Sequence, residues 1–232
     1  MGACAITFPT IAVVPVLPGG KMDIAIHKIE AFDWIVFTST NGVNLFLKRL
    51  FALRRNVPSL QGIKIACIGP GTTAALQAHA IDVDVTAQHN VAEGLIAALE
   101  NADTWKGKKV LIPSAKKTRN LIPMTLKQWG ANVQVVTVYE TVKPKTIDKS
   151  VVSKIVEGNY DCIVFTSSST FTNFKEMLGL RFWKRVEGKL RAVSIGPVTT
   201  ETIRSAGIEP LAEAKPHTID GLIECVKNLL LK

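Results

Sequence analysis

The chain has 232 residues, an apolar fraction of 47% and a formal net charge of +9 at pH 7. Its length allows one large domain or two of ordinary size, and its apolar fraction is that of a globular protein. The sequence contains no run of the roughly 18 uncharged apolar residues that a membrane span requires, and its proline-interrupted N-terminal stretch has no basic leader. We therefore expect a cytoplasmic protein without a membrane span.

Strands and helices are expected to alternate along the whole chain. The apolar run at residues 3–8 predicts a first strand, and residues 34–38 and 63–68 predict two more. Each of the latter two is followed by a segment of helical period, "NGVNLFLKRLF" and "GPGTTAALQAHA", and "VDVT", "AEGLIAALE", "KKVLIPS", "TRNLIPMTLKQWG" and "NVQVVTVYE" continue the pattern. Continuous apolar strands separated by amphipathic helices predict a parallel sheet covered by helices on both faces.

The second half of the chain repeats the first half in the same order. The spacing between the copies is nearly constant, because Phe165 follows Phe37 by 128 positions and Gly196 follows Gly69 by 127. This regularity indicates two copies of one α/β unit. The matching segments are "DWIVFTSTNGVNLFLKRL" with "DCIVFTSSSTFTNFKEML", "IACIGPGTTAAL" with "AVSIGPVTTETI", and "AEGLIAAL" with "IDGLIECV".

The repeat also predicts how the domains are connected. "WGANVQVVTV" at residues 129–138 aligns with "MGACAITFPT" at residues 1–10, so the first strand belongs to the last domain. We therefore predict that one α/β domain is inserted into the other. The predicted parts are an outer domain of residues 1–12 and 145–232, an inner domain of residues 29–137, and connectors at 13–28 and 138–144.

One βα unit of the inner copy has no counterpart in the outer copy. The strand and helix at residues 109–128 are the missing pair, so we expect the outer domain to lack its N-terminal βα unit. A start codon assigned too late would explain this difference.

Hydroxyl side chains recur at equivalent positions of both copies. Thr38 and Ser39 follow one strand, as Ser167 and Ser168 follow its repeat, and Thr72 and Thr199 open helices after Gly-Pro turns. In a parallel sheet these positions lie beyond the carboxyl ends of the strands, where helix N-termini attract anions such as carboxylates or phosphates. The alternative is that these hydroxyls only cap their helices.

Residues typical of strong acid–base, metal or nucleotide chemistry are sparse. The sequence has no GxSxG, HExxH, Walker A or GxGxxG motif, and its four cysteines form no CxxC motif or Cys/His cluster. We expect free thiols, no metal and no other cofactor. Tyr139, one of only two tyrosines, lies in the predicted crossing segment, where its hydroxyl could face a cleft or its ring could pack at a hinge.

The positive charge suits a polyanionic partner. No aromatic residues interleave with the densest basic group, so we expect no specific binding of nucleic acid, and a solvated lysine-rich face remains an alternative. The group comprises Lys106, Lys108, Lys109, Lys116, Lys117 and Arg119.

These motifs together resemble the uroporphyrinogen-III synthase family over nearly the whole chain. The resemblance rests on "FTSTNGV", "IGPGTTAAL", "VYETV", "YDCIVFTSSST", "SIGPVTTETI" and "TIDGLIECV", in the family's order and spacing. It implies two flavodoxin-like α/β domains joined by a two-stranded connector, with an active site between them. It also implies an enzyme without a cofactor that closes hydroxymethylbilane to uroporphyrinogen III, with loss of water and inversion of the last ring.

The resemblance also implies roles for individual residues. Tyr139 matches the connector tyrosine that assists loss of the hydroxyl group and is the expected catalytic residue. The expected substrate-binding positions, which would hold the carboxylates of hydroxymethylbilane, are Thr38, Ser39, Thr72, Arg119, Ser167, Ser168 and Thr199. We further expect a monomer that makes at most transient contact with hydroxymethylbilane synthase. The alternatives are a non-catalytic tetrapyrrole-binding relative, acting as a sensor or interaction module, and a basic nucleic-acid-binding protein.

Overall fold

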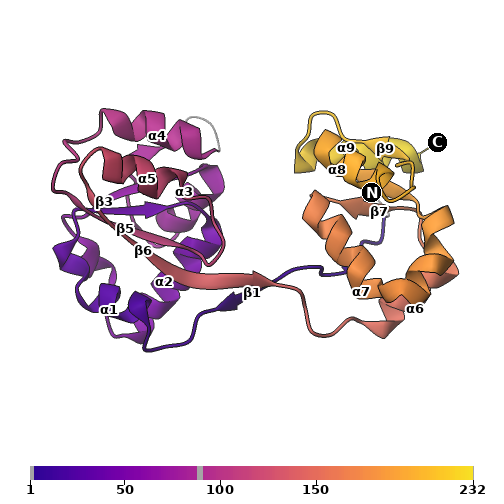
Figure 1. The fold of residues 1–232 in the computed structure, drawn as a ribbon, viewed down its shortest axis with the longest axis horizontal. Helices are drawn as coiled ribbons and strands as arrows, with labels where there is room; N and C mark the ends of the chain where they lie inside the picture. The colour runs from indigo at the N-terminus through magenta and orange to yellow at the C-terminus, as the bar shows by residue number, and fades with distance from the viewer. Residues whose placement is uncertain (1–2, 88–90, 232) are drawn as a thin grey trace. The chain divides into compact units, whose positions relative to one another are not determined.

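The protein is described by a computed structural model that covers residues 3–87 and 91–231 (Figure 1). The chain divides into two compact units, so that it passes between them twice. Unit 1 comprises Met1–Ala12 and Val142–Lys232, and unit 2 comprises Val13–Thr141. No helix within the described residues is long and apolar enough to cross a membrane.

Unit 2 contains the larger sheet. Its strands are β1 (Ala12–Pro15), β2 (Trp34–Phe37), β3 (Lys64–Cys67), β4 (Val85–Thr86), β5 (Lys109–Ala115) and β6 (Asn132–Val142). Its helices are α1 (Lys21–His27), α2 (Thr40–Ala52), α3 (Pro70–Gln77), α4 (Ala92–Glu100) and α5 (Leu121–Gln128), with 3₁₀ turns at Ile29–Ala31 and Val57–Leu60.

The strands of unit 2 lie in the order β1-β6-β5-β2-β3-β4. The pairs β2–β3, β2–β5, β3–β4 and β5–β6 are parallel. Without β1, this is the flavodoxin-like order entered at its third strand, because the two strands that open that fold, β5 and β6, come last in this chain. The two-domain α/β fold with parallel sheets expected from the sequence is thereby confirmed.

Alternation along β2 divides the core of unit 2 into two layers. Ile35 and Phe37 belong to a buried cluster with α1, α2 and α3, while Trp34 and Val36 belong to a second cluster with α4 and α5. All four β2 side chains are buried, as expected for the central strand of a sheet covered on both faces.

The segment at residues 13–28 carries more structure than a connector requires. It contains most of β1 and all of α1, and α1 buries Met22, Ala25 and Ile26 in the core of unit 2. Arg49 of α2 donates hydrogen bonds to the carboxylate of Asp23, which holds the pKa of Asp23 below its usual range and fixes α1 against α2.

Unit 1 has a smaller sheet in the order β7-β8-β9, and both of its strand pairs are parallel. Its elements are α6 (Lys149–Glu157), β7 (Ile163–Phe165), α7 (Ser168–Val186), a 3₁₀ turn (Glu187–Lys189), β8 (Ala192–Ser194), α8 (Pro197–Arg204), β9 (Ala212–Glu213) and α9 (Ile219–Leu230). Helix α7 is kinked at Gly179, which has a φ of 72°.

The strand predicted at residues 3–8 is wrong. Residues 3–11 form no regular element, although Phe8 packs on Phe174 with ring centroids 5.2 Å apart and Asn173 donates a hydrogen bond to the Thr10 carbonyl. In unit 2 the corresponding residues form β6, which pairs with β5. No counterpart of β5 occurs among the described residues of unit 1, so the ladder that would hold residues 3–8 extended has no partner strand.

Side chains at equivalent positions of the internal repeat make equivalent contacts in the two units. Phe37 meets Phe46 edge to face in unit 2, as Phe165 meets Phe174 in unit 1. At the ends of β3 and β8, a small polar side chain contacts a threonine of the following helix, and the next strand supplies a third polar group. These trios are Cys67–Thr73–Thr86 and Ser194–Thr200–Glu213.

Substitution of Gly221 by alanine should destabilise unit 1. An added Cβ at this position in α9 would lie 2.0 Å from the carbonyl oxygen of Pro216, which is backbone and must move. We expect a loss of about 2–4 kcal/mol, measured by thermal denaturation followed by circular dichroism. Gly188→Ala is the control, because its Cβ would meet nothing within 4 Å and should change stability by less than about 0.5 kcal/mol.

Candidate active site

The strand order of unit 2 defines where a ligand would bind. From β2 the chain moves outward through β3 and β4, then returns to the other side of β2 to form β5. The topological switch point therefore lies between β2 and β5, and ligands of such sheets bind beyond the carboxyl ends of the strands at this point. The residues that follow Phe37 and Ala115, at the ends of β2 and β5, lie at this edge.

Ser39 is the N-cap of the helix that follows β2. Its Oγ accepts a hydrogen bond of 3.1 Å from the Gly42 backbone N–H, which satisfies one of the free donors of α2. Gly42 leaves room for this bond, because an added Cβ would make a tight contact of 3.2 Å with the same Oγ. Both Thr38 and Ser39 are partly exposed at the carboxyl end of β2.

A β-bulge determines the direction of the Tyr139 side chain. Ser114 pairs with Thr137 and Ala115 pairs with Tyr139, so one extra residue of β6, Val138, lies between them. Consecutive residues of a regular strand face opposite sides, but here Val138 and Tyr139 both pack in the cluster with α1, α2 and α3. The bulge thus turns Tyr139 toward the helix that Ser39 caps.

The hydroxyl groups of Ser39 and Tyr139 form a hydrogen bond of 3.1 Å, with 100 positions between the residues. Tyr139 is only 7% exposed, so its ring is fixed by packing and its Oη stands at the edge of the core. Since Ser39 Oγ already accepts from Gly42, its own proton can be donated to Tyr139 Oη. In that arrangement the tyrosine proton is directed to a ligand, and the positive end of α2 polarises the whole chain of hydrogen bonds.

Two helix N-termini lie side by side in unit 2. An added Cβ at Gly71 would lie 3.5 Å from Thr40 Oγ1, so the first turns of α2 and α3 are neighbours. Thr72 is buried in the first turn of α3, and its Oγ1 has no partner among the described residues of unit 2. Free backbone N–H groups and an available hydroxyl make this edge suitable for an anionic group.

Unit 1 repeats the same arrangement. Ser167 caps α7 by accepting from the Thr170 N–H, and Ser168 Oγ donates to the Val198 carbonyl in the first turn of α8. Thr199 is as buried as Thr72, and no partner of its hydroxyl occurs among the described residues. Capping therefore accounts for Ser39 and Ser167, and it leaves the hydroxyls of Thr72 and Thr199 unexplained.

The contact that the Arg119 side chain makes is with a different helix, α4. This side chain is 84% exposed, and its ion pair is with Glu93 in the first turn of α4, at 3.9 Å. Lys116, which the sequence places only in the basic group, contacts the backbone of Tyr139: the Lys116 N–H donates to the Tyr139 carbonyl, and Lys116 Nζ pairs with Glu140. The register of β5 on β6 creates this proximity, and no local motif encodes it.

The basic group predicted from the sequence is not a single patch. Lys106, Lys108 and Lys109 precede or begin β5, whereas Lys116, Lys117 and Arg119 follow its end. Six strand residues, 110–115, lie between Lys109 and Lys116 and separate the two sets by roughly 20 Å. Only the second set is near the carboxyl edge of the sheet.

Among the described residues, no three His, Cys, Asp or Glu side chains form a cluster that could hold a metal ion. The cysteines there are unpaired, and Cys4 is exposed while Cys67 is buried.

The chain matches a family model described as "Uroporphyrinogen-III synthase HemD" over residues 1–224. It is 29% identical over 222 residues to the uroporphyrinogen-III synthase of Chlorobaculum parvum, covering 95% of this chain and 86% of that protein. It is likewise 29% identical over 232 residues to that of Synechococcus elongatus, covering 98% of this chain and 86% of the relative.

Solved structures agree at the level of the fold. A mutant uroporphyrinogen III synthase from Thermus thermophilus has a TM-score of 0.61 at 16% identity, covering 97% of this chain and 88% of that one. The Helicobacter pylori enzyme has a TM-score of 0.61 at 23% identity, covering 96% of this chain and 91% of that one.

The Ser39–Tyr139 contact can be measured by a double-mutant cycle on stability. Ser39→Ala should cost about 1 kcal/mol through the lost cap, and its effect should shrink in a Tyr139→Phe background by about 0.5–1 kcal/mol. Urea unfolding followed by tryptophan fluorescence reports mainly on unit 2, which contains Trp34, Trp105 and Trp129. Strictly additive effects would contradict the hydrogen bond.

Proposed function

Because the chain belongs to the uroporphyrinogen-III synthase family, we propose that it closes hydroxymethylbilane to uroporphyrinogen III, with loss of water and inversion of ring D. The observation that carries the proposal is the Ser39–Tyr139 hydroxyl pair, held at the switch point of a parallel sheet beside a helix N-terminus. The family model matches residues 1–224, which include parts of both units, and this supports assigning the reaction to the chain as a whole.

Tyr139 is the proposed catalytic residue, and Ser39 positions its hydroxyl. In the first step the C–O bond of the substrate breaks, and its electron pair leaves with the hydroxyl group. The neighbouring pyrrole nitrogen supplies electrons to the carbon and gives up its N–H proton, which combines with the departing hydroxide, so the products of this step are an azafulvene and water. Tyr139 Oη donates a hydrogen bond to the departing oxygen, while Ser39 donates to Oη and keeps the tyrosine proton directed outward.

The rest of the catalysis is orientation. A flexible tetrapyrrole must be held curled so that the inverted ring closes, and holding reacting groups in place lowers a barrier without a strong acid or base. We propose that hydroxyls and helix N–H groups bind the substrate carboxylates. The residues are Thr38, Ser39 and Thr72 in unit 2, Ser167, Ser168 and Thr199 in unit 1, and Arg119 as a more peripheral cation.

The expected compartment, oligomeric state and partner of the protein are part of the same proposal. We place the enzyme in the cytoplasm as a monomer, with only transient contact with hydroxymethylbilane synthase. Four free cysteines are in keeping with a reducing compartment.

Tyr139→Phe should lower kcat by about 10- to 100-fold, because the ring keeps its packing while the departing oxygen loses one hydrogen-bond donor. The assay supplies hydroxymethylbilane, oxidises the products and separates the uroporphyrin isomers. Thermal denaturation of the variant verifies its fold. Turnover equal to the parent protein would leave Tyr139 as a packing residue only.

Thr72→Val and Thr199→Val should each raise KM by about fivefold, as expected for one lost hydrogen bond to a carboxylate, and should change kcat less. Valine keeps the volume of each buried side chain. Thr202→Val, one turn further along α8, is the matched control, since the Thr202 hydroxyl donates to the Val198 carbonyl instead. An unchanged KM in both variants, or an equal rise in the control, would contradict the assignment.

A further inference from the structure

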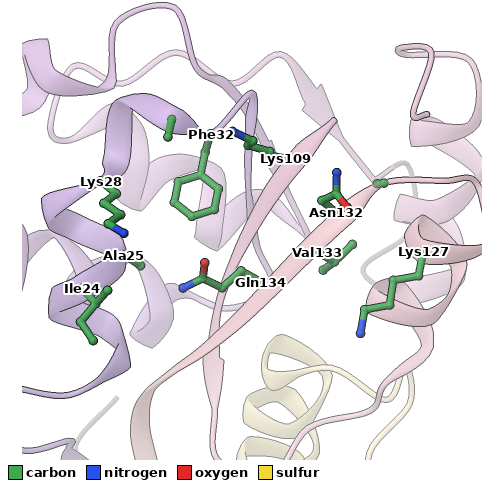
Figure 2. Close-up of a pocket in the computed structure, with 11 residues that line it drawn as sticks. Ile24, Ala25, Lys28, Phe32, Lys109, Lys127, Asn132, Val133 and Gln134 are labelled. Atoms are coloured by element: carbon green, nitrogen blue, oxygen red, sulfur yellow. The ribbon is translucent and has the colours of Figure 1, made fainter. Parts of the chain in front are cut away.

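A groove of about 620 Å³ lies along the edge of β6, at the opposite end of the strand from Tyr139 (Figure 2). Its volume is in the range of ordinary ligand sites, yet it is far along β6 from the hydroxyl pair. Lys28, Phe32, Lys109, Lys127, Val133 and Gln134 are among the residues that line it, and all of them belong to unit 2.

The groove exposes strand backbone. β1 has four residues against eleven in β6, and Val16, directly after β1, donates to the Val138 carbonyl, so β1 lies beside the carboxyl end of β6 (Figure 1). At the other end, the Asn132 N–H donates to the Lys108 carbonyl. Backbone groups alternate sides along a parallel ladder, so those of Asn132 and Gln134 face β5, while those of Val133, which lines the groove, and of Val135 face the opposite edge of β6.

Two helical layers form the walls of the groove. Figure 2 shows Gln134 on the same side of β6 as Lys28 and Phe32, and Val133 on the side of Lys127. The buried clusters agree, because Val133 packs with α5 and Phe32 packs with the layer of α1. An added strand would therefore direct alternate side chains toward Lys28 and toward Lys127.

The charge of the groove is one-sided. Three lysines and no acidic residue line it, and in the described part of the chain no carboxylate lies within 4.0 Å of the Nζ atom of any of the three. The nearby Asp103 is occupied by Lys64, Lys108 and the Trp34 indole N–H, and Asp33 accepts from the Lys109 backbone. The groove thus has uncompensated positive charge beside free strand donors and acceptors.

We propose that this groove binds an extended acidic segment of a partner protein, which adds to β6 as an edge strand. Main-chain hydrogen bonds to Val133 and Val135 would provide the register, and acidic side chains facing both walls would pair with Lys28 and Lys127. A second copy of the chain is a poor occupant, because the same lysines repel a basic edge. The proposal is independent of the reaction assigned above, since it uses none of its residues.

The test uses the full chain labelled with ¹⁵N and a synthetic peptide, TVEDVTV, with blocked ends. Binding should protect the Val133 and Val135 amides from hydrogen exchange, while the Asn132 and Gln134 amides, already paired with β5, should change little. Affinity should fall as salt rises. The peptide TVQNVTV, which has the same shape without charge, should bind at least about tenfold more weakly.

Charge reversal locates the site. Lys28→Glu with Lys127→Glu should weaken binding of TVEDVTV by about tenfold or more, and both side chains are exposed, so the fold should persist. Lys149→Glu with Lys154→Glu on α6 of unit 1 makes the same charge change at two exposed helix positions and should alter affinity less than about twofold.

Three results would overturn the proposal. One is the absence of binding up to about 1 mM peptide, and another is equal affinity for the neutral peptide. The third is displacement of the acidic peptide by citrate without any protection of Val133 or Val135, which would make the groove a site for small anions instead. Uroporphyrinogen III formation, measured in parallel, should be the same in the double lysine variant and in the parent chain.

Discussion

The parallel pairing of β2 with both β3 and β5 is the constraint on which the rest of unit 2 depends. It buries Trp34–Phe37 completely and so requires helices on both faces of the sheet. It also requires the chain to leave β2 in one direction and return on the other side, which creates a switch point at the carboxyl ends. The hydroxyl pair of Ser39 and Tyr139 lies at that point because one residue follows β2 and the other lies beside the end of β5.

One extra residue of β6, Val138, determines the geometry of the candidate site. Tyr139 would face the opposite layer if β6 were regular, since Val138 already packs toward α1 and α2. The bulge opposite Ser114 and Ala115 adds a residue and turns Tyr139 to the same side. A buried ring with a hydroxyl at its tip is then held by packing, and a helix cap supplies its hydrogen-bond partner. The precision comes from the strand and the helix, which are more rigid than loops.

Sequence reasoning could predict what repeats and what is periodic. The two copies, their alternating strands and helices, and the hydroxyls after β2 and β7 all follow from patterns within a few residues. It could not predict the bulge or the proximity of Lys116 to Tyr139, because both depend on register between strands far apart in sequence. It was wrong about residues 3–8 for the same reason: their apolar pattern suits a strand, but a strand also needs a neighbour to pair with.

The two sites proposed at the ends of β6 would attract negative charge by different physical means. At the carboxyl end, backbone N–H groups and the hydroxyls of Thr72 and Ser39 provide fixed partial charges that need no flexible side chain, which suits a reaction governed by orientation. At the amino end, Lys28 and Lys127 provide full charges on long, mobile side chains beside an open strand edge. Such charges favour a partner of opposite charge and raise its association rate, but they fix its position less tightly. The proposed substrate site and the proposed docking groove therefore lie at opposite ends of one strand and differ in how they would bind negative charge.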